Sequence, residues 1–237
     1  LVCAALARGT TTLEGVLFAD DTEAMVDCLR GLGVQLRLDR DAAVAQVVGV
    51  RGTPPVEGAL LDARMSGTTS RFVMPVAALR RATVVLDGAP SLRVRPMGDL
   101  IDSLRELGAS IAELGEPGHL PVQIDATGLP GGRISVRGDV SSQFLSALLL
   151  SGPDMDDGLQ VSVSTRLVSR PYVDMTLSVM SAFGAHATGD ADELAVLPTG
   201  YRSPGTYRIE PDASAASYFF AAAAIRGGRV RVEGLGT

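Results

Sequence analysis

The chain has 237 residues, of which 46% are hydrophobic and 20% are charged, so it can bury a sizeable core and is not a disordered tail. Its formal net charge of −6 argues against nucleic-acid binding, and its longest apolar runs, such as FFAAAAI, are too short to cross a bilayer. Cys3 and Cys28 stand in apolar helical patterns without metal-type spacing, so we expect buried free thiols, no metal site and no disulfide framework.

The first residues, LVCAALARG, have the pattern of the end of an apolar helix and contain no Met, so we expect the chain to be a fragment of a longer protein. Three amphipathic helices are then predicted along the chain, each with apolar residues at three-residue steps and a glycine at its end. They occur in DTEAMVDCLRGLGVQL, MGDLIDSLRELGASI and YVDMTLSVMSAFGAHA, and their terminal glycines are Gly33, Gly108 and Gly184. These glycines lie 75 and 76 residues apart, which indicates an internal triplication.

A second kind of helix alternates with the first and begins with hydroxyl residues before an apolar run. It is predicted in SGTTSRFVMPVAALRR, SSQFLSALLLSG and DASAASYFFAAAAIR, and short alternating strands are predicted in RISVR, LQVSV and RVRV. The order predicts an α/β fold of three βαβαββ units over residues 1–208, related by a pseudo-threefold axis, with mixed sheets around buried helices. A second domain of the same kind is expected to begin at residue 209, and residues 209–237 should hold its first helix and strand.

Ser141, Ser142 and Gln143 stand at the predicted start of one of these helices, and two explanations are open. A serine often caps a helix by accepting a hydrogen bond from a free N–H of the first turn. Two hydroxyls at a helix N-terminus also suit a dianionic phosphate, because the helix end carries partial positive charge. If the units pack around a common axis, several helix N-termini converge, which favours the anion site.

Five segments then carry a resemblance to a known family: ADDTEAM, SGTTSRF, RVRPMGDLIDSLRELGA, SSQFLSALLL with LVSRPYVDMTL, and SPGTYRIEPDASAASYFFAAAAI. In this order and spacing the chain resembles the 3-phosphoshikimate 1-carboxyvinyltransferase (EPSP synthase) family. The resemblance implies a three-repeat, inverse α/β barrel-like lobe and most of one of two lobes around a cleft. It also implies transfer of the carboxyvinyl group of phosphoenolpyruvate to the 5-hydroxyl of shikimate-3-phosphate, with release of phosphate. The implied enzyme needs no cofactor, is cytoplasmic, and is a monomer when full length.

The resemblance implies site residues at the matching positions. Those implied to bind shikimate-3-phosphate are Ser141, Ser142, Gln143, Ser169 and Tyr172. Those implied to bind phosphoenolpyruvate are Gly67, Thr68, Arg71, Arg95 and again Gln143. Without the resemblance, Ser169 would be an ordinary helix cap and Arg95 a surface ion-pair partner, while Arg93 and Arg170 have no assigned role.

The family's acid–base carboxylates and its lysines are implied to lie outside these residues, and all 21 basic residues here are arginines. We therefore expect no catalytic residue in this chain and no activity of the chain alone. Two alternatives stay open. One is the UDP-N-acetylglucosamine carboxyvinyltransferase family, which shares the repeats and phosphoenolpyruvate; the other is a non-enzymatic anion-binding module of the same fold.

Overall fold

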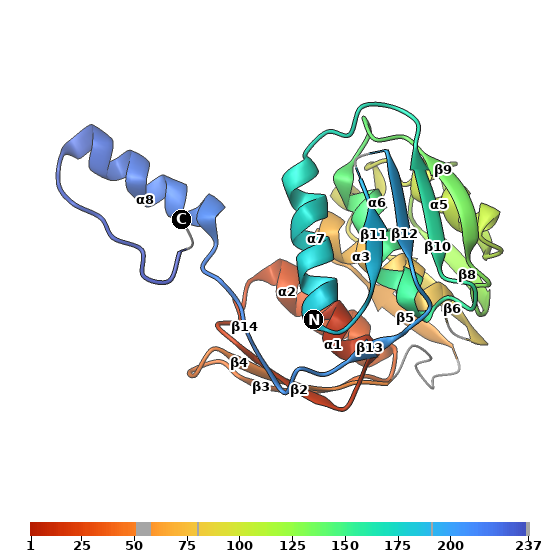
Figure 1. The fold of residues 1–237 in the computed structure, drawn as a ribbon, viewed down its shortest axis with the longest axis horizontal. Helices are drawn as coiled ribbons and strands as arrows, with labels where there is room; N and C mark the ends of the chain where they lie inside the picture. Colours follow the sequence, from red (N-terminus) through yellow and green to blue (C-terminus); the bar gives the residue numbers. More distant parts are fainter. Residues whose placement is uncertain (51–57, 80, 191, 236–237) are drawn as a thin grey trace.

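The computed structural model describes residues 1–50, 58–79, 81–190 and 192–235 (Figure 1). Most of these residues form one body of sheets and helices, and helix α8 (Ala213–Arg226) lies apart from it, at the left of Figure 1. The last strand of the body ends at Arg208, so the boundary predicted at residue 209 falls between that strand and α8. The division into two domains stays a prediction.

Three four-stranded sheets with one common pattern make up the body, as far as the described residues show. In each sheet the first two strands are parallel and the remaining neighbours are antiparallel. The second sheet has the order β5 (Ala59–Asp62), β6 (Arg81–Asp87), β8 (Val122–Thr127) and β7 (Ser110–Glu113). The third has the order β9 (Gly132–Val136), β10 (Leu159–Val163), β12 (Glu193–Val196) and β11 (Ala187–Gly189). This repetition confirms the predicted triplication.

The first sheet is completed by a strand from the other end of the body. Its order is β14 (Thr206–Arg208), β2 (Thr10–Glu14), β4 (Val44–Val48) and β3 (Gln35–Asp39). The parallel pair therefore joins residues 206–208 to residues 12–14. A two-stranded parallel sheet of β1 (Ala7–Arg8) and β13 (Tyr201–Arg202) supports the same junction.

The helices fall into the two predicted kinds. Helices α1 (Val2–Leu6), α3 (Gly67–Ala78) and α6 (Ser142–Ser151) are almost wholly buried. Helices α2 (Asp20–Gly31), α5 (Gly98–Glu106) and α7 (Arg170–Ala182) bury one face each, and short helical turns occupy α4 (Pro90–Arg93) and Gly152–Asp154. Gly33, Gly108 and Gly184, which were predicted to end α2, α5 and α7, have φ values of 84°, 99° and 76°. These are left-handed values, typical of the glycine that follows a helix.

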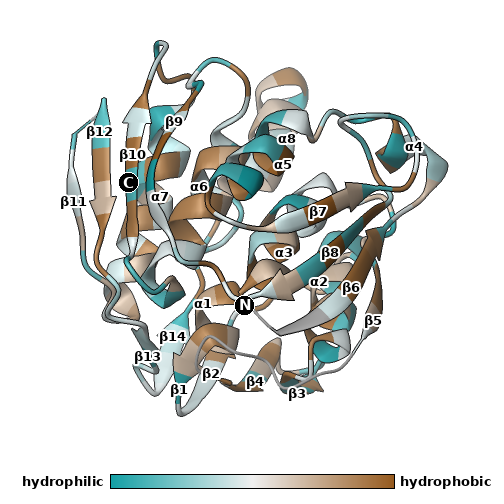
Figure 2. Cartoon of the chain, turned by 90° about the vertical axis from the view of Figure 1, so that its right-hand side faces the viewer, coloured by the Kyte–Doolittle hydropathy of each residue, from teal (hydrophilic) through white to brown (hydrophobic). Residues whose placement is uncertain are grey.

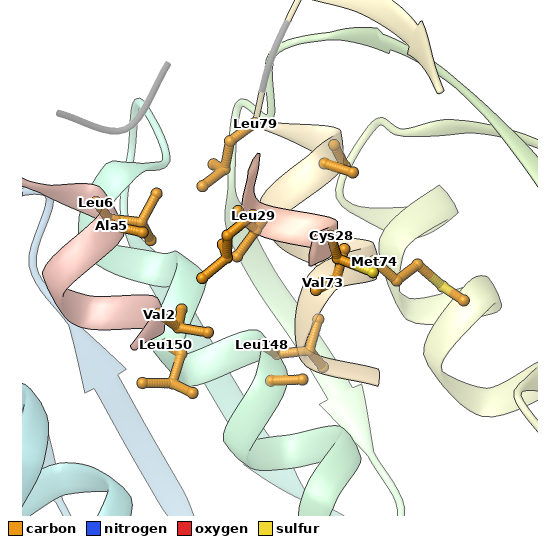
Figure 3. Packing of buried hydrophobic residues seen from close by; sticks show 14 of the residues in the cluster. Val2, Ala5, Leu6, Cys28, Leu29, Val73, Met74, Leu79, Leu148 and Leu150 are labelled. Carbon is orange, nitrogen blue, oxygen red and sulfur yellow. The ribbon is translucent and has the colours of Figure 1, made fainter. Parts of the chain in front are cut away.

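The core forms where the buried helices meet. Figure 3 shows Leu29 of α2 among side chains of α1, α3 and α6, and its exposed fraction is 0%. Figure 2 shows α6, inside the body, mostly in brown, the colour of hydrophobic residues. Cys3 and Cys28 belong to this core as free thiols, as predicted. The core fixes the buried helices, and through them the loops at their N-termini.

The segment after the body departs from prediction in one respect. Asp212 caps α8, accepting from the backbone N–H groups of Ser214 and Ala215 at 2.8 and 3.1 Å. Residues 229–232, predicted as a strand, form none, because no strand in the described part of the chain lies beside them to complete a ladder. Most of α8 is exposed, including Tyr218 and Ile225 at 79% and 83%. Within the described ranges, no helix combines the length and apolar character that a bilayer span needs.

Candidate anion-binding site

The site is built from four loops that follow parallel strands. Strands β9 and β10 lead into the loops before α6 and α7, and strands β5 and β6 lead into the loops before α3 and α5. Because the strands of each pair run in the same direction, their loops leave the sheet at the same edge. Residues far apart in the sequence are thereby brought beside helix N-termini.

A hollow of about 400 Å³ lies at the start of α6 and α7. Its lining combines hydroxyls, an amide, an arginine and a few apolar groups: Arg71, Val140, Ser141, Ser142, Gln143, Val168, Ser169 and Tyr172. A second hollow, of about 150 Å³, lies on the third sheet, where its Arg133 already donates to Gln160. The first hollow is the better anion site, since two helix N-termini add partial positive charge to its donors.

Ser141 caps α6, and its capping bond is compatible with a second role at an anion site. Ser141 is the N-cap of α6, and its Oγ accepts a hydrogen bond from the backbone N–H of Gln143 at 3.3 Å. That bond uses a lone pair and leaves the hydroxyl hydrogen free to donate. The Ser142 hydroxyl has no hydrogen-bond partner among the described residues. It therefore does not cap the helix, and its O–H is free to donate to a ligand.

Ser169 is not an ordinary cap. It is the N-cap residue of α7, yet its side chain makes no capping bond and its backbone is left-handed, with φ 60° and ψ 42°. This conformation costs a serine about 1–2 kcal/mol. The fold holds the residue so that its hydroxyl stays without a protein partner in the described structure. Tyr172, one turn later and 56% exposed, adds a ring to the rim of the hollow.

Gln143 joins the hollow to α3. The Nη1 group of Arg71 donates to its Oε1, and its Nε2 donates to the hydroxyl of Thr68 at 3.1 Å. With both ends of the amide engaged, its orientation is defined by its neighbours. The amide thus links the start of α6 to the start of α3.

Two arginines meet beside the start of α3, and no carboxylate of the described residues pairs with either. Arg71 is half-buried, its guanidinium lies 5.1 Å from the centre of the Phe144 ring, and its Nε is buried with no hydrogen-bond partner. Burial and the nearby charge of Arg95 lower the pKa of Arg71. Neither Arg71 nor Arg95 forms an ion pair with any described carboxylate. Like charges this close favour an anion between them.

Gly67 lies directly beneath these guanidinium groups. A Cβ at this position would stand 2.5 Å from Nη1 of Arg95 and 3.5 Å from Nη1 of Arg71. The bare backbone therefore lets Arg95 approach the N-terminus of α3 in its observed position, from which a Cβ would displace it, whereas Arg71 would only come into ordinary contact with that Cβ. The helix itself is capped by Ser66, which accepts from the N–H of Thr69 at 3.1 Å.

All nine predicted site residues therefore belong to one surface. Six line the hollow, and Gly67, Thr68 and Arg95 adjoin it through Arg71 and Gln143. Two arginines without an assigned role are occupied elsewhere: Arg93 pairs with Asp87 at 2.6 Å, and Arg170 with Asp174 at 2.7 Å. The apolar lining by Val140 and Val168 was not predicted, because an exposed valine in a loop carries no sequence signal.

The fold is an α/β body of three repeated units, and the hollow at the start of α6 and α7 is lined by hydrogen-bond donors and by no acidic side chain, as a candidate anion site requires. Comparison with known sequences gives the family. The profile of EPSP synthase (3-phosphoshikimate 1-carboxyvinyltransferase) matches residues 1–237, and the chain belongs to this family.

Named relatives agree with this assignment. The 3-phosphoshikimate 1-carboxyvinyltransferases of Shewanella piezotolerans and Vibrio atlanticus are 42% and 41% identical to the chain over 239 aligned residues. Each alignment covers 100% of this chain and 56% of the relative, so the chain spans about half the length of these relatives. An EPSP synthase structure from Acinetobacter baumannii matches with a TM-score of 0.82 and 26% identity, over 99% of this chain and 52% of that one. The UDP-N-acetylglucosamine carboxyvinyltransferase alternative is therefore not favoured.

Proposed function

We propose that the chain is the shikimate-3-phosphate-binding lobe of an enzyme that transfers the carboxyvinyl group of phosphoenolpyruvate to the 5-hydroxyl of shikimate-3-phosphate. Family membership and the names of the relatives support this reaction. The observation that carries the proposal is the convergence of free hydroxyl donors and unpaired guanidinium groups on one surface.

The phosphate of shikimate-3-phosphate is proposed to bind among Ser141, Ser142 and Ser169. Each hydroxyl has a hydrogen to donate, and the N-termini of α6 and α7 add partial positive charge. Tyr172 is proposed to lie beside the shikimate ring, since its exposed ring forms part of the same rim.

Phosphoenolpyruvate is proposed to bind beside Gly67, where Arg71 and Arg95 have no carboxylate partner in the described residues. A guanidinium group can pair with two oxygens of a carboxylate or phosphate. Gln143 contacts Arg71 and Thr68 and also lines the hollow, so it is proposed to lie between the two substrates.

The transfer needs a general acid and base, which we place outside these 237 residues. Helix α8 is proposed to be the first helix of the second lobe, which would begin at residue 209. An apolar helix with Tyr218, Phe219 and Ile225 exposed is of the kind that a surrounding domain buries. A monomeric, cytoplasmic protein with no nucleic-acid partner remains the expectation for the whole enzyme.

Titration of the chain with shikimate-3-phosphate and with shikimate, followed by NMR, tests this proposal. Two or three charge-assisted bonds of about 1.5–3 kcal/mol each, less the cost of association, predict roughly millimolar affinity for shikimate-3-phosphate. The Ser214→Ala variant, in the exposed first turn of α8, is the control and should bind unchanged. An equal response to both ligands would show that the phosphate is not recognised. Turnover by the chain alone would contradict the placement of the acid and base elsewhere.

A further inference from the structure

The side chain of one threonine, Thr165, makes three hydrogen bonds between the two serine-bearing loops of the hollow. Residues 137–141 lead from β9 to α6, and residues 164–169 lead from β10 to α7. The hydroxyl of Thr165 accepts from the backbone N–H groups of Gly138 and Asp139 at 2.9 and 3.1 Å. It also donates to Oδ1 of Asp139 at 2.9 Å. One hydroxyl thus uses its donor and both lone pairs on the neighbouring loop.

The loops also touch backbone to backbone at this point. Val168 donates its N–H to the carbonyl of Gly138 at 2.9 Å, one residue before Ser169. A Cβ on Gly138 would lie 2.7 Å from the carbonyl oxygen of Thr165 and 2.9 Å from Cα of Leu167. The two loops are therefore in close contact at Gly138. The Thr165 hydroxyl binds at this same point, so its hydrogen bonds help to set the distance between the loops.

The carboxylate in this contact is itself held in place. Arg137 donates from Nε and Nη2 to the two carboxylate oxygens of Asp139, each at 3.2 Å. These bonds, with the one from Thr165, lower the pKa of Asp139, so it remains an acceptor at neutral pH. The turn that precedes Ser141 is therefore held by hydrogen bonds from Arg137 and from Thr165.

A second bond joins the two helices one turn below. The hydroxyls of Ser146 on α6 and Thr176 on α7 lie 2.8 Å apart. Thr176 donates its hydrogen to the carbonyl of Tyr172 at 2.8 Å, so Ser146 must be the donor of the pair. Ser146 is four residues after Ser142, and Thr176 four after Tyr172. The two helices are thus joined through the loops before their N-termini and again in their second turns.

We propose that Thr165 is a positioning residue for the phosphate subsite. It does not contact the ligand itself. Its hydroxyl sets the distance between the Ser141–Ser142 loop and the Ser169 loop, so that donors from both reach one phosphate group. The proposal rests on the proposed function, because it takes the phosphate of shikimate-3-phosphate as the ligand.

The test compares Thr165→Val with Thr165→Ser by NMR titration of the folded chain with shikimate-3-phosphate. Valine has the shape of threonine without the hydroxyl, and serine keeps the hydroxyl without the methyl group. Thr165→Val should weaken binding about tenfold, the effect of one misplaced charge-assisted hydrogen bond. Thr165→Ser should bind within about twofold of the unsubstituted chain by the same reasoning. The ³¹P shift of the bound ligand should change in the valine variant alone.

Thr83→Val is the matched control. Thr83 is an exposed threonine of β6 that also donates to an aspartate, Asp125, at 2.9 Å, in a different sheet. It should lose a similar bond and leave affinity and the ³¹P shift unchanged. If Thr165→Val does not fold, Asp139→Ala removes the acceptor of the Thr165 hydrogen together with the ion pair to Arg137, and about a threefold loss of affinity is expected.

The outcomes separate this inference from the proposed function. Unchanged affinity in Thr165→Val, or in Asp139→Ala where that replaces it, overturns the positioning role alone. An equal loss in Thr165→Val and Thr83→Val also overturns it, because the effect would then follow general stability. No binding of shikimate-3-phosphate by the unsubstituted chain overturns both.

Discussion

Ser141 and Ser142 are adjacent hydroxyls with different structural duties, so alanine at each position should give a different pair of effects. Ser142 has no hydrogen-bond partner in the described structure, whereas Ser141 accepts from the N–H of Gln143. Ser142→Ala should therefore weaken binding of shikimate-3-phosphate without changing stability. Ser141→Ala should weaken both.

The magnitudes follow from the bonds involved. Loss of one hydrogen bond to a charged phosphate, about 1.5–3 kcal/mol, lowers affinity about 10- to 150-fold. Loss of a serine cap costs about 0.5–2 kcal/mol, and the 3.3 Å distance at Ser141 places this cap at the weaker end. A loss of about 0.5–1 kcal/mol corresponds to a fall of about 1–4 °C in the melting temperature of a chain of this size.

The assay is a pair of measurements on each variant: thermal unfolding followed by circular dichroism, and NMR titration with shikimate-3-phosphate. A matching fall in melting temperature for Ser142→Ala and Ser141→Ala would refute the reasoning, because Ser142 would then carry a structural bond. Unchanged affinity in both would return the SSQ motif to simple helix capping.

Three further predictions concern the arginine pair, the core and the thiols. Gly67→Ala should displace Arg95 and weaken phosphoenolpyruvate binding about tenfold, with unfolding free energy unchanged within about 0.5 kcal/mol; equal binding in a ³¹P NMR titration would contradict this. Leu29→Ala should lower the free energy of unfolding by about 2–5 kcal/mol in urea titrations, and a loss below about 1 kcal/mol would mean that the site is not packed as Figure 3 shows. Burial raises the pKa of Cys3 to about 11 and that of Cys28 to about 12, so between pH 9 and 11 the thiols ionise mainly in the unfolded chain. Stability should then fall with rising pH by up to about 1.4 kcal/mol per pH unit for each thiol, and a variant with alanine at both positions should show a shallower fall between pH 9 and 11.

Local patterns predicted the elements that local physics determines. The glycines that end α2, α5 and α7 were recognisable because a left-handed C-terminal residue favours glycine. Strand β10 was predicted at its observed bounds, since alternation of buried and exposed positions is visible in LQVSV. The same alternation in RVRV misled, because a strand also needs a partner, and the sequence does not say whether one is near.

Long-range contacts left no comparable signal. The pairing of β14 with β2 joins short segments from opposite ends of the body. Neither segment has a sequence pattern that indicates which strand it will pair with. Thr165 looked like an ordinary loop residue, since its role arises only where β9 and β10 bring two loops together. The left-handed backbone of Ser169 was equally hidden, because no glycine marks the position.

The site residues themselves were predicted as a set through the family resemblance, and their geometry adds what the resemblance could not. Gln143 and Arg71 were assigned as ligand-binding residues, and the structure adds that they hydrogen-bond each other. Arg170 was left without a role, although its i,i+4 spacing to Asp174 on a predicted helix is the pattern of the ion pair that the structure shows.

The closure of the first sheet by β14 also bears on how the lobe is made. Strand β2 is synthesised early, yet its parallel neighbour is separated from it by roughly two hundred residues of chain. At about 5–20 residues per second, a ribosome needs about 10–40 s to supply that neighbour. During that interval β2 is an open edge, available to other chains. Translation speed and chaperone capture over this interval are therefore expected to influence the yield of correctly folded lobe, even though both lie outside its equilibrium stability.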